Sequence, residues 1–235
     1  MTTRFKLCSF TTCPWVQRAA IVLRAKGIEY EIEYIEREKD KRPDWFRAIS
    51  PHLKVPVLII DGKDSLFESN AIAEYLDEVA APRLHPADPI ARARNRAWTD
   101  YLPEFASAVS RCAYSNTKAE LEERAREIPE VFETLEGALE KRGNDGPFFN
   151  GPDFSLVDAG YAPFLQRYAF TDRLYPLGII EKYPLLKAWS DALLAHPAVR
   201  KSTIAAIEQD WRDNLVRHDR WLSTLLDGAP AAAAE

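Results

Sequence analysis

The first part of the chain alternates between the two-residue period of strands and the longer period of helices. Residues 4–10 and 29–35 alternate polar and apolar side chains, which predicts two strands. The segment between them, residues 13–27, carries apolar side chains at helical spacing and predicts a helix. Pro14 suits the first helical position, and Gly27 suits the position just past the end.

Two short apolar runs follow, and the tripeptide Asp61-Gly62-Lys63 separates them. An Asp-Gly turn between apolar runs at 55–60 and 64–67 predicts a β-hairpin. Residues 68–79 are amphipathic and predict a helix, and a shorter helix is expected near 43–49. The resulting order predicts a parallel start that is closed by an antiparallel hairpin and a helix.

Residues 81–89 contain three prolines and predict a linker. Beyond the linker the pattern of apolar positions is helical. The expected helices are 88–115, 118–142, 155–169, 184–195 and 197–214. We therefore expect two domains, an α/β domain at residues 1–80 and an all-α domain at residues 88–235.

The composition and charge of the chain narrow its class. Apolar residues make up 46% and charged residues 29% of the sequence, which is ordinary for a globular protein. The formal net charge of −5 argues against a nucleic-acid partner, because nucleic-acid-binding domains usually carry a basic patch. No apolar run reaches the length of about 18 residues that a membrane-spanning helix needs, so no membrane association is expected.

The N-terminus and the cysteines indicate a cytoplasmic protein. The first residues lack the apolar stretch and the small-residue cleavage site of a signal peptide. Three cysteines do not make a disulfide framework, and an odd number without an export signal points to a reducing compartment. The four histidines and three cysteines show no spacing typical of metal ligands, so we expect no metal site.

Cys13 is the strongest candidate for chemistry, because it stands between the first predicted strand and the first predicted helix. Backbone N–H groups and the positive end of the helix dipole favour a thiolate there and lower its pKa from about 8.5. A dithiol site would need a second cysteine three residues on, where the chain has Val16. Cys13 would therefore act as a monothiol with an external thiol, for which glutathione is the abundant choice. The alternative is an inert cysteine, as we expect for Cys8 and Cys112 in the core.

Two dipeptides extend the predicted site. Val55-Pro56 opens a strand, and a cis peptide bond there would expose the Val55 backbone to an extended, peptide-like ligand, although a trans bond is the commoner case. Glu68-Ser69 begins the helix after the hairpin. Ser69 suits a helix cap whose N–H groups can bind a carboxylate, and Glu68 can take an ammonium group. Plain helix capping is the alternative for this pair.

These motifs together resemble a known family. The runs SFTTCPWVQRAAIVLRAKGIEYE at 9–31 and PDWFRAISPHLKVPVLIIDGKDSLFESNAIAEYLDE at 43–78 resemble the N-terminal domain of cytosolic glutathione transferases, most closely the omega class. Residues 154–158, Phe-Ser-Leu-Val-Asp, are similar to the capping box of the family's helical domain. The resemblance implies a thioredoxin-like first domain, an all-helical second domain, glutathione as co-substrate and a homodimer.

The resemblance also implies roles for individual residues. Cys13 would form a mixed disulfide with glutathione. The Val55 backbone, next to a cis Pro56, would pair with the cysteinyl unit of the tripeptide. Glu68 and Ser69 would hold the γ-glutamyl head.

Two positions depart from the family's pattern. Arg42 falls where the omega class has a lysine that meets the glycyl carboxylate, and its guanidinium can bind a carboxylate bidentately. Trp15 replaces the usual Phe or Tyr after Cys-Pro and would form a wall of the site, unless it is ordinary packing. For the second substrate the candidates are Tyr114, Tyr168 and Trp211, each of which can equally be a core residue.

The predicted function is glutathione-dependent thiol transfer through Cys13. Its substrate would be a mixed disulfide, dehydroascorbate or a glutathionyl thioether of an aromatic compound. The first alternative is a conjugating transferase, lyase or isomerase for aromatic electrophiles, in which Ser9, Thr11 or Thr12 activates glutathione. The second alternative is a binding or regulatory protein with the same fold and no catalysis.

Overall fold

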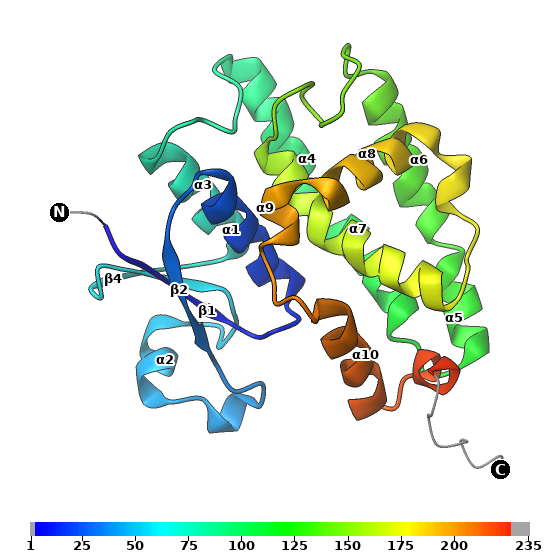
Figure 1. Ribbon diagram of the computed structural model, residues 1–235, viewed down its shortest axis with the longest axis horizontal. Helices are drawn as coiled ribbons and strands as arrows, with labels where there is room; N and C mark the ends of the chain where they lie inside the picture. The colour runs from blue at the N-terminus through cyan, green and yellow to red at the C-terminus, as the bar shows by residue number, and fades with distance from the viewer. Residues whose placement is uncertain (1–2, 227–235) are drawn as a thin grey trace.

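A computed structural model describes residues 3–226 of the chain (Figure 1). The sequence up to residue 79 forms a four-stranded sheet with helices on it. Its elements are β1 (Phe5–Ser9), α1 (Pro14–Ala25), β2 (Tyr30–Tyr34), α2 (Asp44–Ile49), β3 (Val57–Ile60), β4 (Asp64–Phe67) and α3 (Ser69–Val79). The strand order is β2-β1-β3-β4, in which β1 pairs with β2 in parallel and the other pairs are antiparallel. The predicted α/β start with its closing hairpin is confirmed.

The core of this part lies between the sheet and the helices α1 and α3. Leu7 of β1 and Leu58 of β3 are completely buried, and so are Leu23 of α1 and Leu76 of α3. The first helix is unusual because every residue from Val16 to Leu23 is buried, including polar side chains. It lies between the sheet and the helical part of the molecule and packs against both α3 and α7. A helix buried on all sides is well placed to hold residues at its N-terminus in a fixed position.

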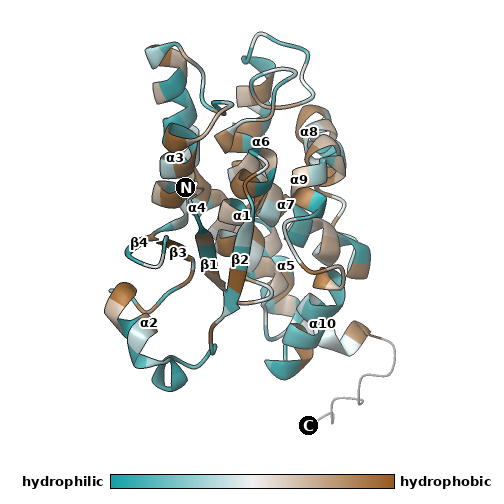
Figure 2. Ribbon diagram, turned by 60° about the vertical axis from the view of Figure 1, so that its left-hand side comes forward, coloured by the Kyte–Doolittle hydropathy of each residue, from teal (hydrophilic) through white to brown (hydrophobic). Residues whose placement is uncertain are grey.

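The rest of the described chain is helical, as predicted. The helices are α4 (Pro89–Ala113), α5 (Lys118–Ala125), α6 (Ile128–Glu140), α7 (Leu156–Leu174), α8 (Pro184–Ala195), α9 (Pro197–Arg200) and α10 (Ile207–Arg217). Figure 2 shows hydrophobic residues along the inner helices, whereas α10 is mostly hydrophilic. A glutathione-transferase-like architecture is therefore present, with a thioredoxin-like sheet part followed by a helical part.

Two predicted helices are each split in two. The segment expected as one helix at 118–142 is broken between α5 and α6, and Pro129 stands in the first turn of α6. Proline has no N–H to give to the preceding turn, so it starts a helix more readily than it continues one. The segment expected at 197–214 breaks after the short α9, and the chain runs through 201–206 before α10 begins.

The long helix α7 starts with a capping box, as predicted. The Ser155 hydroxyl accepts the Asp158 N–H, and the Asp158 carboxylate accepts the Ser155 N–H at 2.7 Å. The same carboxylate also accepts the Phe149 N–H at 2.9 Å and the Trp189 indole N–H at 2.6 Å. The capping box therefore joins the start of α7 to the loop before it and to α8.

The connection between the two parts is held by buried charges. Lys26 at the end of α1 pairs with Asp77 of α3 at 2.9 Å and donates to the carbonyl oxygens of Ala80 and Pro82. Asp77 in turn accepts the backbone N–H of Leu84 at 2.6 Å. The division into domains at 1–80 and 88–235 stays a prediction, and residues 227–235 of the second range lie outside the described residues.

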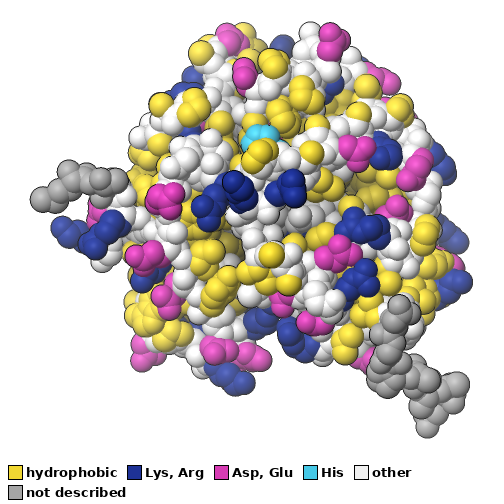
Figure 3. All heavy atoms as spheres, viewed as in Figure 1, with side chains coloured by type: hydrophobic (Ala, Val, Ile, Leu, Met, Phe, Trp, Pro, Cys, Tyr) yellow, Lys and Arg dark blue, Asp and Glu magenta, His cyan; other side chains and the backbone are white. Residues whose placement is uncertain are grey.

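The face shown in Figure 3 mixes acidic, basic and hydrophobic side chains. Lys and Arg side chains gather near its middle, where α1 and α9 lie in Figure 1. Among the helices of residues 3–226, none is both long and apolar enough to cross a bilayer.

Candidate active site

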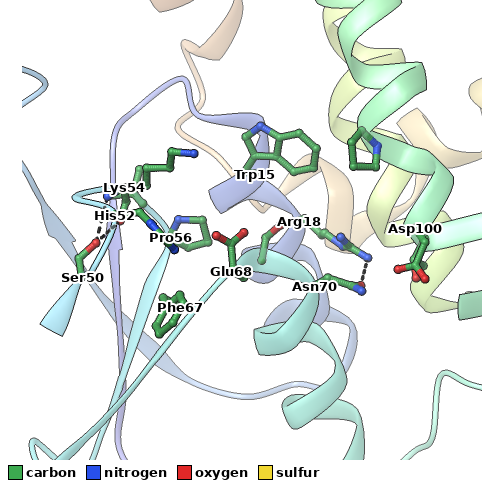
Figure 4. A pocket seen from close by; sticks show the side chains of 14 residues that line it. Trp15, Arg18, Ser50, His52, Lys54, Pro56, Phe67, Glu68, Asn70 and Asp100 are labelled. Atoms are coloured by element: carbon green, nitrogen blue, oxygen red, sulfur yellow. Dashed lines mark hydrogen bonds between the residues drawn. The ribbon is translucent and has the colours of Figure 1, made fainter.

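A cleft of about 360 Å³ lies where the loop before β3, the end of β4 and the start of α3 meet α1 and α4 (Figure 4). Its lining includes five residues that the sequence assigned to glutathione binding, namely Trp15, Val55, Pro56, Glu68 and Ser69. These residues come from three separate segments of the chain, and the fold of the sheet brings the segments together. The cleft is therefore the natural place for an extended ligand beside the N-terminus of α1.

The Val55–Pro56 peptide bond is cis. Val55 is buried, with 8% of its surface exposed, and it directly precedes the turn into β3. Its neighbour Lys54 is fixed by Ser50, whose hydroxyl donates to the Lys54 carbonyl at 2.9 Å and accepts the Lys54 N–H at 3.0 Å. This loop therefore presents a defined backbone edge to the cleft.

Glu68 and Ser69 lie at the N-terminus of α3. The helix begins at Ser69, which is buried, and Glu68 occupies the capping position without a side-chain capping hydrogen bond. The expectation that Ser69 itself is the cap is therefore not met. Glu68 is exposed and has a φ of 66°, a value that side-chain-bearing residues rarely adopt. Figure 4 shows its carboxylate between Pro56 and Arg18.

Several residues that line the cleft were not found by sequence reasoning. Arg18 of α1 is 2% exposed and donates to the Asn70 side chain of α3, and Asp100 of α4 stands beyond them (Figure 4). Burial lowers the pKa of the Arg18 guanidinium to about 10, so it stays charged at neutral pH. A buried arginine in the middle of an apolar helix pattern was the available signal in the sequence.

Lys54 and His52 also line the cleft. His52 packs edge-on against Phe67, with the ring centroids 5.9 Å apart. The Lys54 side chain is exposed and extends in the direction of Trp15 in Figure 4. Within residues 3–226 its ammonium group makes no hydrogen bond, so it is available to a ligand.

Arg42 does not line the cleft. Its side chain is folded into the loop after β2, where it donates to the carbonyl oxygens of Glu36 at 3.0 Å and Arg37 at 2.7 Å. The guanidinium also lies 5.1 Å from the centre of the Phe10 ring, and Arg42 is only 6% exposed. Two of its three guanidinium nitrogens thus serve the loop while the third is buried without a partner among the described residues, and the structure offers Lys54 at the cleft instead.

Cys13 is the N-cap residue of α1, as the sequence predicts, and its side chain is half-buried. Cys13 does not itself line the cleft: it stands two residues before the cleft-lining Trp15 and lines a smaller pocket of about 110 Å³ together with Thr11 and Ser202. Burial raises the pKa of the Cys13 thiol above its ordinary value. The N–H groups of Val16 and Trp15, and the charges of Arg167 and Arg37, act in the opposite direction. The expected lowering of the pKa by the helix N-terminus is therefore outweighed by desolvation.

The other two cysteines are core residues. Cys8 is 0% and Cys112 is 1% exposed. Burial raises the pKa of Cys8 to about 12 and that of Cys112 to about 11. Of the three cysteines, Cys13 is the one that is not fully buried.

The three candidates for the second-substrate pocket do not share one environment. Tyr114 follows α4, and burial raises its pKa while the charges of Arg167 and Arg37 oppose this. Trp211 of α10 is completely buried, and its indole N–H has no hydrogen-bond partner in the described chain. Tyr168 instead packs in the helical core, 5.1 Å from the Phe132 ring, and its hydroxyl accepts the Ile180 N–H.

The three hydroxyls beside Cys13 are engaged by other groups. Ser9 donates to the Phe10 carbonyl at 2.7 Å. The Thr11 and Thr12 hydroxyls accept from Arg37 at 3.2 and 2.9 Å. None of the three lines the cleft, and Ser9 and Thr11 line the same small pocket as Cys13. In residues 3–226 no group of His, Cys, Asp and Glu side chains is arranged to hold a metal ion.

Comparison with known proteins points to one family. Models of the glutathione S-transferase N-terminal and C-terminal domains match residues 12–79 and 118–192. A probable glutathione S-transferase of Glycine max is 32% identical over 205 residues, which covers 83% of this chain and 86% of that protein.

Solved structures agree with this assignment and come from more than one class. A Tau-class glutathione S-transferase from mango has a TM-score of 0.76 at 27% identity, covering 88% of this chain and 96% of its own. The glutathione transferase Omega 3C of Trametes versicolor has a TM-score of 0.71 at 26% identity, with 86% and 90% covered. A rice enzyme in complex with glutathione, GST1, has a TM-score of 0.79 at 26% identity, with 94% and 99% covered.

Proposed function

Because the chain belongs to the glutathione S-transferase family, we propose that it is a glutathione-dependent thiol transferase with Cys13 as its nucleophile. The observation that carries this proposal is the position of Cys13. It is a partly exposed residue at the start of a buried helix, two residues before Trp15, which lines the cleft with the cis Val55–Pro56 bond and the Glu68-Ser69 turn. Glutathione is the co-substrate of the family, and the rice relative is solved in complex with it.

The proposed cycle consists of two thiol–disulfide exchanges. In the first, the Cys13 thiolate attacks the glutathionyl sulfur of a mixed disulfide. A Cys13–glutathione disulfide forms, the S–S bond of the substrate breaks, and the released thiolate takes a proton from solvent. In the second, the thiolate of another glutathione attacks the bound glutathionyl sulfur, which frees Cys13 and yields oxidised glutathione. Dehydroascorbate and glutathionyl thioethers are the other substrate classes under this proposal.

Glutathione would lie along the cleft with its peptide backbone against Val55. Glu68 and the N–H groups at Ser69 would hold the charged γ-glutamyl head, because a helix N-terminus favours a carboxylate. We assign the glycyl carboxylate to Lys54, whose free ammonium lies at the cleft, in place of Arg42, which does not line the cleft and donates from two guanidinium nitrogens to the loop.

Within the family we propose an omega-like enzyme that works as a cytoplasmic homodimer. The support for the omega class is local, since it comes from the Cys13-Pro14-Trp15 sequence. The overall similarity to Tau-class and omega structures is comparable. Three free thiols, two of them deep in the core, are compatible with a reducing compartment.

The first experiment is the intact mass of the protein after incubation with oxidised glutathione. We expect a single glutathione adduct in the wild type that excess glutathione removes. The adduct should be absent in Cys13→Ala and present in Cys112→Ala, the matched control. No adduct in the wild type, or the same adduct in Cys13→Ala, would sink the cysteine mechanism.

The first alternative is conjugation activated by a hydroxyl group. It is weakened for Ser9, whose hydroxyl already donates to the Phe10 carbonyl, whereas Thr11 and Thr12 accept from Arg37 and, within the described chain, keep their own O–H groups free to donate. Cys13→Ser tests it directly, because a conjugating enzyme would keep or gain activity on a chloronitroaromatic compound. The second alternative, a non-catalytic binding or regulatory protein, would be favoured by failure to bind glutathione at millimolar concentration.

A further inference from the structure

Two arginines hold the segment that leads into Cys13, and they come from opposite parts of the molecule. Arg37 follows β2 and donates from one guanidinium nitrogen to the hydroxyls of Thr11 and Thr12, at 3.2 and 2.9 Å. Arg167 lies on α7 in the helical part and donates to the Thr12 carbonyl oxygen at 3.2 Å. The residue directly before Cys13 is therefore gripped on its side chain by one guanidinium and on its backbone by the other.

The burial of Arg167 is unusual for a cation. It is 5% exposed, and its remaining hydrogen bond goes to the neutral side chain of Gln166 at 2.6 Å. Among the described residues, neither Arg167 nor Arg37 has a carboxylate within ion-pair distance, although eleven such pairs occur elsewhere. Arg167 lies 5.6 Å from the centre of the Phe170 ring, but a buried charge without a carboxylate partner is expensive in free energy, so its place beside Cys13 indicates a role for the charge.

The charged and titratable groups around this spot can be named for each element. Arg167 of α7 faces Cys13, Tyr114 at the end of α4 and Asp210 of α10. Arg37 faces Cys13 and Tyr114 from the segment after β2. Asp210, Glu36, Glu38 and the cation Arg217 line a pocket together with Arg37, and within residues 3–226 none of these carboxylates forms an ion pair with Arg37 or Arg167. Both guanidinium groups lie close enough to Cys13 for their charge to favour its thiolate.

We propose that Arg37 and Arg167 form an arginine clasp on Thr12 and act as positioning residues that stabilise negative charge on the Cys13 sulfur during thiol transfer. This inference rests on the proposed function, because the charge would matter for thiol transfer. Its test does not, because it measures the reactivity of Cys13 alone. The clasp partly offsets the burial of Cys13, because desolvation disfavours the thiolate and the two nearby guanidinium groups favour it. It also means that the helical half of the chain supplies a charge on which the chemistry of the sheet half depends.

The experiment is the rate of Cys13 alkylation by iodoacetamide between pH 7 and pH 11, followed by peptide mass. This reaction needs a thiolate and neither glutathione nor a second substrate. Cys8 and Cys112, both buried, serve as internal controls for unfolding in every sample. The variants are Arg167→Gln, which removes the charge but keeps a donor, Arg167→Lys, which keeps the charge, and Arg37→Gln.

We expect Arg167→Gln and Arg37→Gln to raise the pH midpoint of alkylation by about one unit and to slow the reaction roughly tenfold at pH 7.5. Arg167→Lys should recover most of the wild-type profile. Arg173→Gln is the matched control, because Arg173 lies on the same helix but is exposed and pairs with Glu208. A structural role alone would change the plateau rate or expose Cys8 and Cys112, without moving the midpoint.

Two outcomes separate the inferences. A midpoint that stays at the wild-type value in Arg37→Gln and in a folded Arg167→Gln overturns the arginine clasp, whatever the protein does with glutathione. If Arg167→Gln does not fold, the half-buried Arg37 still decides the question through Arg37→Gln. A shifted midpoint together with no glutathione adduct on the wild type supports the clasp and contradicts thiol transfer.

Discussion

Lys54 shows how one exposed side chain decides the assignment of a binding site. It stands immediately before the cis Val55–Pro56 bond, and its backbone is fixed by Ser50. We predict that Lys54→Gln weakens glutathione binding by roughly tenfold, because a charge-assisted hydrogen bond to a carboxylate contributes about 1.5–3 kcal/mol. Titration calorimetry with glutathione measures this change. Lys63→Gln, in the exposed turn between β3 and β4, should bind like the wild type.

Arg42→Gln provides the complementary comparison. Since its guanidinium donates to the carbonyls of Glu36 and Arg37, its loss should reduce stability and leave glutathione affinity nearly unchanged. If Arg42→Gln lost affinity while Lys54→Gln kept it, the carboxylate would belong to Arg42 and our assignment would be wrong.

At the residue scale, local motifs were predictable and side-chain directions were not. Val55-Pro56 and Glu68-Ser69 lie at strand and helix starts that the sequence pattern predicts, so their place at the cleft follows from the fold. The Arg42 side chain points inward because it donates to two carbonyl oxygens and lies against the Phe10 ring. The spacing of residues in the sequence does not predict these contacts.

The capping box of α7 is the element with the clearest expected effect on stability. Asp158 is completely buried and accepts hydrogen bonds from Ser155, Phe149 and Trp189. We predict that Asp158→Ala lowers the free energy of unfolding by about 3–5 kcal/mol, because several buried donors lose their acceptor at once. Ser155→Ala removes a single cap and should cost about 1 kcal/mol.

Denaturant unfolding of these variants tests the prediction. Asp153→Ala is the matched control, since Asp153 is exposed in the loop before the box. Equal stability of Asp158→Ala and Asp153→Ala would show that the box is not what holds α7 to α8.

Element types were largely predictable, whereas interruptions within the helices were harder to place. The helical period runs through Pro129, and the pattern alone does not say whether a proline kinks a helix or starts a new one. Tertiary packing favours a new helix at this point, because α5 packs against α4, whereas α6 also packs against α8.

At the scale of the whole molecule, Glu74 ties the sheet part to the helical part. Its carboxylate on α3 meets His85 of the linker at 2.7 Å and Arg96 of α4 at 2.7 Å. Burial alone would raise the pKa of Glu74, but the hydrogen bonds from His85 and Arg96 lower it to about 2. The carboxylate therefore stabilises the folded state above the ordinary glutamate pKa, and this stabilisation is lost as the pH falls towards 2.

We predict that Glu74→Gln reduces the free energy of unfolding by about 2 kcal/mol at pH 7. The difference from the wild type should shrink steadily below about pH 4.5, where the unfolded glutamate binds its proton. Urea unfolding at a series of pH values measures the difference, with the exposed Glu78→Gln as control. A difference that does not change between pH 7 and pH 3 would contradict the assignment.

The contacts between the two parts were beyond the reach of the sequence. Arg167 touches the residue before Cys13 across 155 positions of chain. Nothing in the helical pattern distinguishes it from an ordinary surface arginine, and its neighbour Tyr168, which the sequence favoured, points into the core instead. Successive residues on a helix point about a quarter turn apart or more, so a shift of one position changes the compartment that a side chain enters.

The backbone of Glu68 carries a further consequence for anyone who engineers this protein. Its φ of 66° stores conformational strain at the head of the proposed binding cleft, and glycine would adopt this φ freely. A laboratory selection for thermal stability would thus favour Glu68→Gly. The variant would be more stable but would lose the carboxylate that is proposed to bind the ligand. A library screened for stability alone would therefore yield stable variants that no longer bind the ligand, so Glu68 should be held constant in such libraries.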